Sequence, residues 1–257
     1  MKTEFTSISC GELTQFLNQT LEVARFKDYC PNGLQVQGRT TIRTIVTGVS
    51  ANLLLLEKAA ELDADAILVH HGYFWRNEPP CIVGMKQKRL KFLLNKDINL
   101  LAYHLPLDAH PTLGNNVQLA QRLGLLSEMQ VGEANLVSVG YFLDQSTMTL
   151  EALGQTIERV LGRKPLLIGD QRRLVKKIAW CTGAAQGYMQ EAIDAGADVY
   201  ISGEISEPTT HLARESGVAY VAAGHHATER YGVAALGEFL AQQFGLCHHF
   251  VDVDNPV

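Results

Sequence analysis

Histidines and carboxylates gather at three places in this sequence, and each place follows an apolar stretch typical of a buried strand. Neutral imidazole nitrogens and carboxylate oxygens suit divalent transition ions such as Zn, Mn, Fe, Co or Ni. The residue types therefore predict a metal site, provided that the fold brings the three places together. The three sets are His70 with His71, His104 with Asp108, and His225 with Glu229.

The predicted ligand set has too many members for one catalytic ion with an open position. It suits two ions that share a bridging carboxylate, and either Asp108 or Glu229 could be that bridge. Two ions roughly 3.5–4 Å apart lower the pKa of a water between them and stabilise a developing oxyanion. We therefore expect hydrolytic chemistry. The predicted metal ligands are His70, His71, Asp108, His225 and Glu229.

Alternating strand-like and helix-like segments must position these side chains. Ser9 with Glu12 forms a capping box that predicts the start of the first helix. The alternation that follows predicts an α/β fold with a mainly parallel sheet covered on both faces. If His225 opens the last helix, Glu229 lies one turn further along the same helix face. The expected strands are residues 42–47, 66–69, 98–103 and 136–143, and the expected helices are residues 53–62, 85–94, 116–123 and 149–161.

The second half of the chain resembles the first in four segments that occur in the same order. This internal repeat predicts two related α/β lobes, residues 1–130 and 131–257, that together form one compact unit. Corresponding strand ends of two such lobes can face one another, so we expect the metal site in the cleft between them. The matching segments are residues 44–50 with 177–183, 64–72 with 197–205, 100–108 with 218–226, and 119–125 with 240–246.

Glu204 occupies the position in the second half that the histidine pair occupies in the first. It could act as a general base, support a metal ligand, or cap a helix ahead of Pro208. The pair His248 and His249 near the end of the chain has no such correspondence, and we expect it to be structural or exposed. A wholly structural protein, with its histidines satisfied by hydrogen bonds, is the alternative to a metal site.

The composition limits the compartment and the partners. Hydrophobic residues make up 46% and charged residues 19% of the chain, as in globular proteins, and the net charge of −5 gives no support for nucleic-acid binding. The five cysteines are scattered without a CxxC pair, which favours a reducing compartment. The polar start and the absence of a long apolar run indicate neither a signal peptide nor a membrane span. We expect a cytoplasmic protein.

Five motifs in order carry a resemblance to a known family: DYCPNGLQVQG, ILVHHG, YHLPLDAHPTLGNN, ISGE and GHHATERYG. The chain resembles the Nif-three-like family, often labelled GTP cyclohydrolase 1 type 2 homologues. The resemblance implies two related α/β lobes, a dinuclear metal centre between them, and a toroidal homohexamer. It places the metal ligands on the five residues named above and His104 close to the metals.

Two departures from the family pattern are visible. Longer members carry an inserted domain between the lobes, for which 257 residues leave no room. A Gly-Arg-x-Gly element of the family is replaced here by the segment that begins at Gly140 with Tyr141, so no role of that arginine carries over.

The function that we expect is dinuclear metal-dependent hydrolysis of a small molecule, which by the family label could be a nucleotide. The alternative is a non-enzymatic, ring-shaped metal-binding protein that serves as a scaffold, a metallochaperone or a nucleic-acid-associated partner.

Overall fold

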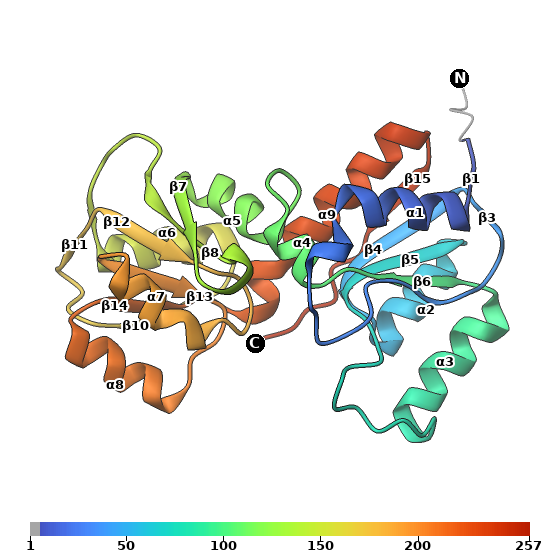
Figure 1. Cartoon of the computed structure of the whole chain (residues 1–257), viewed down its shortest axis with the longest axis horizontal. Coiled ribbons are helices and arrows are strands. Elements are labelled where there is room, and N and C mark those ends of the chain that lie inside the picture. Colours follow the sequence, from blue (N-terminus) through green and yellow to red (C-terminus); the bar gives the residue numbers. More distant parts are fainter. Residues whose placement is uncertain (1–5) are drawn as a thin grey trace. The chain divides into compact units, whose positions relative to one another are not determined.

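The computed structural model describes residues 6–257 and shows a mixed α/β protein with two lobes (Figure 1). The first compact unit contains the chain up to Leu113 together with Gly232–Val253, and the second contains Gly114–Tyr231 together with Asp254–Val257. This division differs from the expected lobes of residues 1–130 and 131–257 that form one compact unit. Among the described residues, no helix combines the length and the apolar character needed to cross a bilayer.

The first unit is built on a five-stranded sheet in the order β15-β4-β5-β6-β2, in which only the edge strand β2 is antiparallel to its neighbour. Its strands are β2 (Gly33–Val36), β4 (Thr44–Ser50), β5 (Ala66–His71), β6 (Asn99–Ala102) and β15 (Cys247–Phe250), and a small ribbon pairs β1 (Ile8–Ser9) with β3 (Thr41–Ile42). Its helices are α1 (Cys10–Thr20), α2 (Leu53–Glu61), α3 (Gly84–Lys96) and α4 (Leu105–Ala109), with a 3-10 turn at Val23–Arg25.

Alternation along β5 divides the core of the first unit into two layers. Ile67 and Val69 lie in the cluster formed with α2 and α3, whereas Ala66 and Leu68 lie in the cluster formed with α1 and the later part of α9. Successive side chains of a strand point to opposite faces, so a strand that is apolar at every position is covered on both sides. The sheet is covered on both faces, as the sequence predicted.

The second unit is built on a six-stranded sheet in the order β10-β14-β13-β12-β8-β7, with β12, β13 and β14 parallel and the others antiparallel to their neighbours. Its strands are β7 (Leu125–Val131), β8 (Val137–Phe142), β10 (Leu166–Ile168), β12 (Lys177–Trp180), β13 (Val199–Ser202) and β14 (Ala219–Ala222), with a ribbon of β9 (Met148–Thr149) and β11 (Leu174–Val175). Its helices are α5 (Asn115–Leu123), α6 (Leu150–Leu161), α7 (Met189–Asp194) and α8 (Glu207–Ser216), with 3-10 turns at Glu133–Asn135 and Gln186–Tyr188, and α9 (His225–Phe244) begins in it.

The internal repeat is present in the strand order and in the hydrogen bonds. The order β4-β5-β6-β2 in one sheet corresponds to β12-β13-β14-β10 in the other, with the same strand directions. Asp65 accepts hydrogen bonds from two successive backbone N–H groups at the start of β4, and Asp198 does the same at the start of β12. The two lobes are therefore related at the level of individual contacts.

The segments that follow the repeated strands explain why the unit boundaries differ from the expected ones. After β6 the chain enters α5 and β7, which belong to the second unit, and β7 joins the sheet that contains β12. After β14 the chain runs through α9 into β15, which pairs with β4 of the first unit. Each repeat thus contributes its last helical residues and its last strand to the other unit, and no periodicity in the sequence reveals this exchange.

Candidate metal-binding clusters

Three histidine rings meet at the carboxyl end of β5 in the first unit. The ring centroids of His70 and His71 are 4.6 Å apart, and that of His104 lies 5.0 Å from His70 and 5.9 Å from His71. One ligand nitrogen from each ring can be chosen so that all three lie within 4.8 Å of one another. The His70–His71–His104 cluster therefore has the donor set and the spacing of a transition-metal site.

A hydrogen bond at Nδ1 fixes each ring of this cluster. The His70 Nδ1 lies 2.9 Å from the carbonyl oxygen of Tyr103, and the His71 Nδ1 lies 3.0 Å from Ser50 Oγ. The His104 Nδ1 lies 2.7 Å from a carboxylate oxygen of Asp28. A partner at one imidazole nitrogen orients the ring, and the other nitrogen, here Nε2, is then the atom that could bind a metal.

His70 and Asp108 lie close to each other in the first unit. The Tyr103 carbonyl can only accept a hydrogen bond, so Nδ1 of His70 donates to it, and the second ring nitrogen is Nε2. This Nε2 lies 3.5 Å from Asp108 Oδ1. An imidazole nitrogen and a carboxylate oxygen are both metal-ligand types, so this pair is a candidate to bind one ion.

The loop that begins at Asp28 holds His104 in place. One oxygen of the Asp28 carboxylate accepts hydrogen bonds from His104 Nδ1 and from the Tyr29 N–H, and the other accepts from the Asn32 amide and from the Leu105 N–H. Burial alone would raise the pKa of Asp28, but the hydrogen bond and the charge of His104, with help from Asn32 and Tyr29, lower it to about 2. Asp28 is therefore an anion that orients His104 and starts helix α4.

The second unit brings together His225, Glu229 and Glu204. The i, i+4 spacing on α9 places His225 Nε2 3.0 Å from Glu229 Oε2, while His225 Nδ1 lies 2.7 Å from Glu204 Oε1. Burial alone would lower the pKa of His225, but the hydrogen bonds and charges of Glu229 and Glu204 raise it to about 9. Glu204 thus stands to His225 as Asp28 stands to His104, as a carboxylate that orients the ring through Nδ1.

Gly183 provides the space that this cluster needs. Its backbone has a φ of +69°, and a Cβ atom built on it would overlap the Glu229 carboxylate and lie 3.2 Å from His225 Nε2. By the internal repeat Gly183 corresponds to Ser50, the residue that orients His71 in the first unit. The two halves of the chain therefore differ at this position. The first half has a serine that forms a hydrogen bond to a histidine, and the second has a glycine that leaves room for the Glu229 carboxylate.

Comparison with known proteins identifies the family. The family model described as DUF34/NIF3 (NGG1p interacting factor 3) matches residues 8–256. The chain belongs to the DUF34/NIF3 family. A protein of Pseudomonas aeruginosa named GTP cyclohydrolase 1 type 2 homolog is 53% identical over 253 residues, which cover 97% of this chain and 99% of the relative.

Two solved structures extend the family likeness to the fold. The structural-genomics protein ybgI, of unknown function, has a TM-score of 0.94 and 49% identity, over 97% of this chain and all of that chain. TTHA1606 from Thermus thermophilus has a TM-score of 0.88 and 33% identity, over 97% of this chain and all of that chain. The resemblance inferred from the motifs is confirmed.

In this DUF34/NIF3 member the predicted site residues fall into two groups. His70, His71, His104 and Asp108 lie together in the first unit, and His225, Glu229 and Glu204 lie together in the second. The residues that orient or accommodate these side chains were not predicted from the sequence. These unpredicted residues are Asp28, Ser50, Tyr103 and Gly183.

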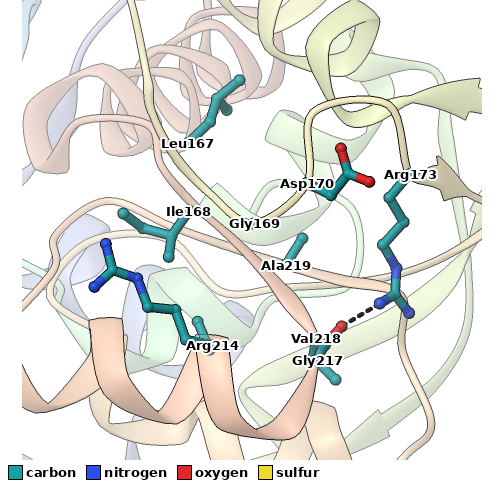
Figure 2. A pocket seen from close by; sticks show the side chains of 10 residues that line it. Leu167, Ile168, Gly169, Asp170, Arg173, Arg214, Gly217, Val218 and Ala219 are labelled. Carbon is teal, nitrogen blue, oxygen red and sulfur yellow. Dashed lines mark hydrogen bonds between the residues drawn. The ribbon is translucent and has the colours of Figure 1, made fainter.

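A separate cavity of the second unit lies away from these residues (Figure 2). It has a volume of about 510 Å³ and is lined by the loop after β10 and by the end of α8 with the start of β14. Arg173 spans one side of it, where it donates a hydrogen bond to the Gly217 carbonyl and lies 3.5 Å from Asp198. The cavity opens at the amino end of β14, whereas His225 follows the carboxyl end of that strand. It contains no histidine and plays no part in the two clusters.

Proposed function

We propose that this DUF34/NIF3 protein is a metal-dependent hydrolase that acts on a small molecule. In this proposal the protein binds two divalent transition-metal ions, drawn from Zn, Mn, Fe, Co and Ni. The proposed ligands are His70, His71, Asp108, His225 and Glu229.

The observation that carries the proposal is the orientation of the histidines. All four rings of the two clusters, those of His70, His71, His104 and His225, have Nδ1 within hydrogen-bond distance of a carbonyl, a hydroxyl or a carboxylate. Histidines that bind metals through Nε2 show this arrangement, because the partner at Nδ1 fixes the tautomer and raises the basicity of the ligand. A histidine exposed on the surface can bond to water and does not require such a partner at Nδ1.

The chain's own residues have separable roles in the proposed reaction. When bound, the two ions would supply an acidified water and a positive charge that stabilises a developing oxyanion. Glu204 holds His225 in its ligand orientation through the hydrogen bond to Nδ1. Asp28 holds His104, whose position beside His70 and His71 makes it the candidate to accept or donate a proton at Nε2.

The proposal also covers the substrate and the oligomeric state. The relatives named GTP cyclohydrolase 1 type 2 homolog make nucleotides the first substrates to test. A cytoplasmic homohexamer, as the motif resemblance implied, is part of the same proposal.

Substitution of Glu229 tests the proposal. We expect Glu229→Gln to lose bound metal and to reduce turnover of the substrate by at least about 100-fold, since the amide lacks the charge of the carboxylate. Metal content would be measured by elemental analysis of protein purified without a metal-affinity tag. Turnover would be measured over a panel of nucleotides that includes GTP.

The matched control is Glu238→Gln, because Glu238 lies exposed on the same helix α9. It should leave metal content and turnover unchanged, and circular dichroism should show both variants folded. Wild-type protein that contains no transition metal, or that turns over substrate equally well after the metal is removed, would refute the proposal. Metal binding without turnover on any substrate would favour the scaffold or metallochaperone alternative.

A further inference from the structure

An aromatic loop in the first unit contacts the histidine cluster. The Trp75 ring lies 5.0 Å from the His104 ring at an interplanar angle of 86°, and 6.1 Å from the His71 ring. Trp75 is only partly buried, unlike the core aromatic residues of the unit. A large π surface thus borders the proposed ligands without belonging to the hydrophobic core.

The backbone that carries Trp75 is held in an unfavourable conformation. Phe74 has a φ of +66°, a region that residues with a large side chain rarely adopt. The Glu78 carboxylate braces this turn, because one of its oxygens accepts hydrogen bonds from the Phe74 N–H at 2.8 Å and the Trp75 N–H at 3.2 Å. Strain that is stabilised by dedicated contacts is characteristic of functional sites.

Tyr29 provides a second ring from a different loop. It lies 6.5 Å from the His104 ring, and 49% of it is exposed. Arg76 joins the two loops, because its N–H donates to the Tyr29 carbonyl at 2.7 Å and its guanidinium lies 5.5 Å from the Tyr29 ring centroid. The two rings therefore flank His104 on loops that are fastened to each other.

We propose that Trp75 and Tyr29 bind a planar, π-rich ring of the substrate, so that the substrate class is heteroaromatic. The position of this ring-binding site rests on the proposed function, since it lies beside the proposed ligands. Stacking on an aromatic side chain strengthens the binding of a base by about 10-fold or more and tolerates different bases. Trp75 and Tyr29 are substrate-binding residues in this proposal, and they take no part in proton transfer.

Two ligands, one with and one without an adenine base, test the proposal. Adenosine 5′-monophosphate and ribose 5-phosphate carry the same phosphate group, so the contribution of the phosphate cancels in the comparison. We expect zinc-loaded wild-type protein to bind the nucleotide at least about 10-fold more tightly than the sugar phosphate by calorimetry. Trp75→Leu should abolish this preference, and Trp75→Phe should retain a preference, because phenylalanine still offers a ring.

Intrinsic fluorescence gives a second reading. The chain has two tryptophans, and Trp180 is fully buried in the second unit, where its indole N–H donates to the Asn116 carbonyl. Nucleotide binding should therefore quench the tryptophan fluorescence of the wild-type protein. The fluorescence of Trp75→Phe, which retains only Trp180, should not change.

Failure of the ring-binding site can be distinguished from failure of the proposed hydrolase function. Equal binding of the two ligands to wild-type protein, or a preference that survives in Trp75→Leu, would overturn the ring-binding site. If Trp75→Leu loses zinc or fails to fold, Tyr29→Leu provides the same comparison, and a preference unchanged in that variant overturns the proposal. An inactive protein that still prefers the nucleotide would reject the hydrolase and support the ring-binding site, whereas an active protein with no preference would do the reverse.

Discussion

The four clustered histidines show how single atoms specify a site. His70 uses a backbone carbonyl, His71 a hydroxyl, and His104 and His225 a carboxylate as the partner of Nδ1. Of these three kinds of partner, only the carboxylate carries a charge. A carboxylate partner therefore distinguishes His104 and His225 from the other two.

Gly183 allows a test at the scale of one methyl group. We expect Gly183→Ala to reduce metal affinity by at least about 10-fold, because its Cβ would displace the Glu229 carboxylate and because its φ of +69° disfavours alanine. Metal affinity would be measured by competition with a chelator of known affinity.

Gly187→Ala is the matched control for this variant. Gly187 lies in the same segment of the second unit, has no positive φ, and has no atom within 4 Å of the position that an added methyl group would take. Its substitution should leave metal affinity unchanged. Equal affinities for Gly183→Ala and the wild type would show that Gly183 does not shape the cluster.

The sequence predicted the candidate ligand residues, but it did not predict the residues that orient them. His70, His71 and Asp108 stand out because ligand-type residues at strand ends are unusual. Gly183 and Ser50 do not stand out, because glycine and serine occur in every loop and their roles depend on a neighbour distant in the chain. A pattern of residue types therefore predicts candidate ligands more readily than the residues that orient them.

At the scale of elements, the loop that begins at Asp28 and the five-residue helix α4 together position residues of the histidine cluster. Helix α4 is too short to be stable alone, yet it carries Asp108 and begins directly after His104. Asp28 fixes the start of this helix through the Leu105 N–H and orients His104 through the other carboxylate oxygen. The loop therefore positions both a histidine and a carboxylate of the cluster.

We expect Asp28→Asn to lower the free energy of unfolding at pH 7 by on the order of 1–3 kcal/mol, because its NH₂ group faces donors where the carboxylate accepted hydrogen bonds. The folded-state pKa of about 2 lies below the ordinary value of 3.8. The stabilisation by the Asp28 charge is therefore present above about pH 4 and is lost as the pH falls towards 2. Urea unfolding of variant and wild type should converge over that range.

Asp63→Asn is the control, since Asp63 is an exposed residue of the same unit. It should not change the free energy of unfolding at pH 7. A difference between Asp28→Asn and the wild type that stays constant from pH 7 to pH 2 would show that the charge of Asp28 is not the stabilising feature.

The elements differ in how well the sequence predicts them. Strong periodicity predicts α2 and β8 to within one residue at each end, because their buried faces are continuous. Strands β7 and β15 were not predicted. Most of β7 is exposed, and β15 is four residues long with two histidines in the middle. Both are edge strands: β7 pairs with the next strand, β8, whereas β15 pairs with β4, which is distant in the chain.

At the scale of the molecule, the exchange of segments makes each unit discontinuous. Val233, Leu236 and Leu240, which follow the second repeat in the chain, are fully buried in the core of the first unit. Burial of three such side chains contributes roughly 5–9 kcal/mol, which is comparable with the whole stability of a domain. The first unit therefore depends on residues that lie more than a hundred positions after its strands β2, β4, β5 and β6.

We expect the isolated fragment of residues 1–130 to be unfolded or aggregated, because it lacks these side chains and strand β15. Residues 6–113 joined by a flexible Gly/Ser linker to Gly232–Val253 should unfold cooperatively in urea and show dispersed amide resonances. Cooperative unfolding of the 1–130 fragment, or an unfolded linked chain, would contradict this account of the fold.

The crossed connections also constrain how such chains can recombine. A crossover between two homologous genes at the middle of the coding sequence would join the first repeat of one parent to the second repeat of the other. Both cores of the chimera would then be mosaics, each with a helix and an edge strand from the wrong parent. Exchange between relatives should succeed only where those packing surfaces already match.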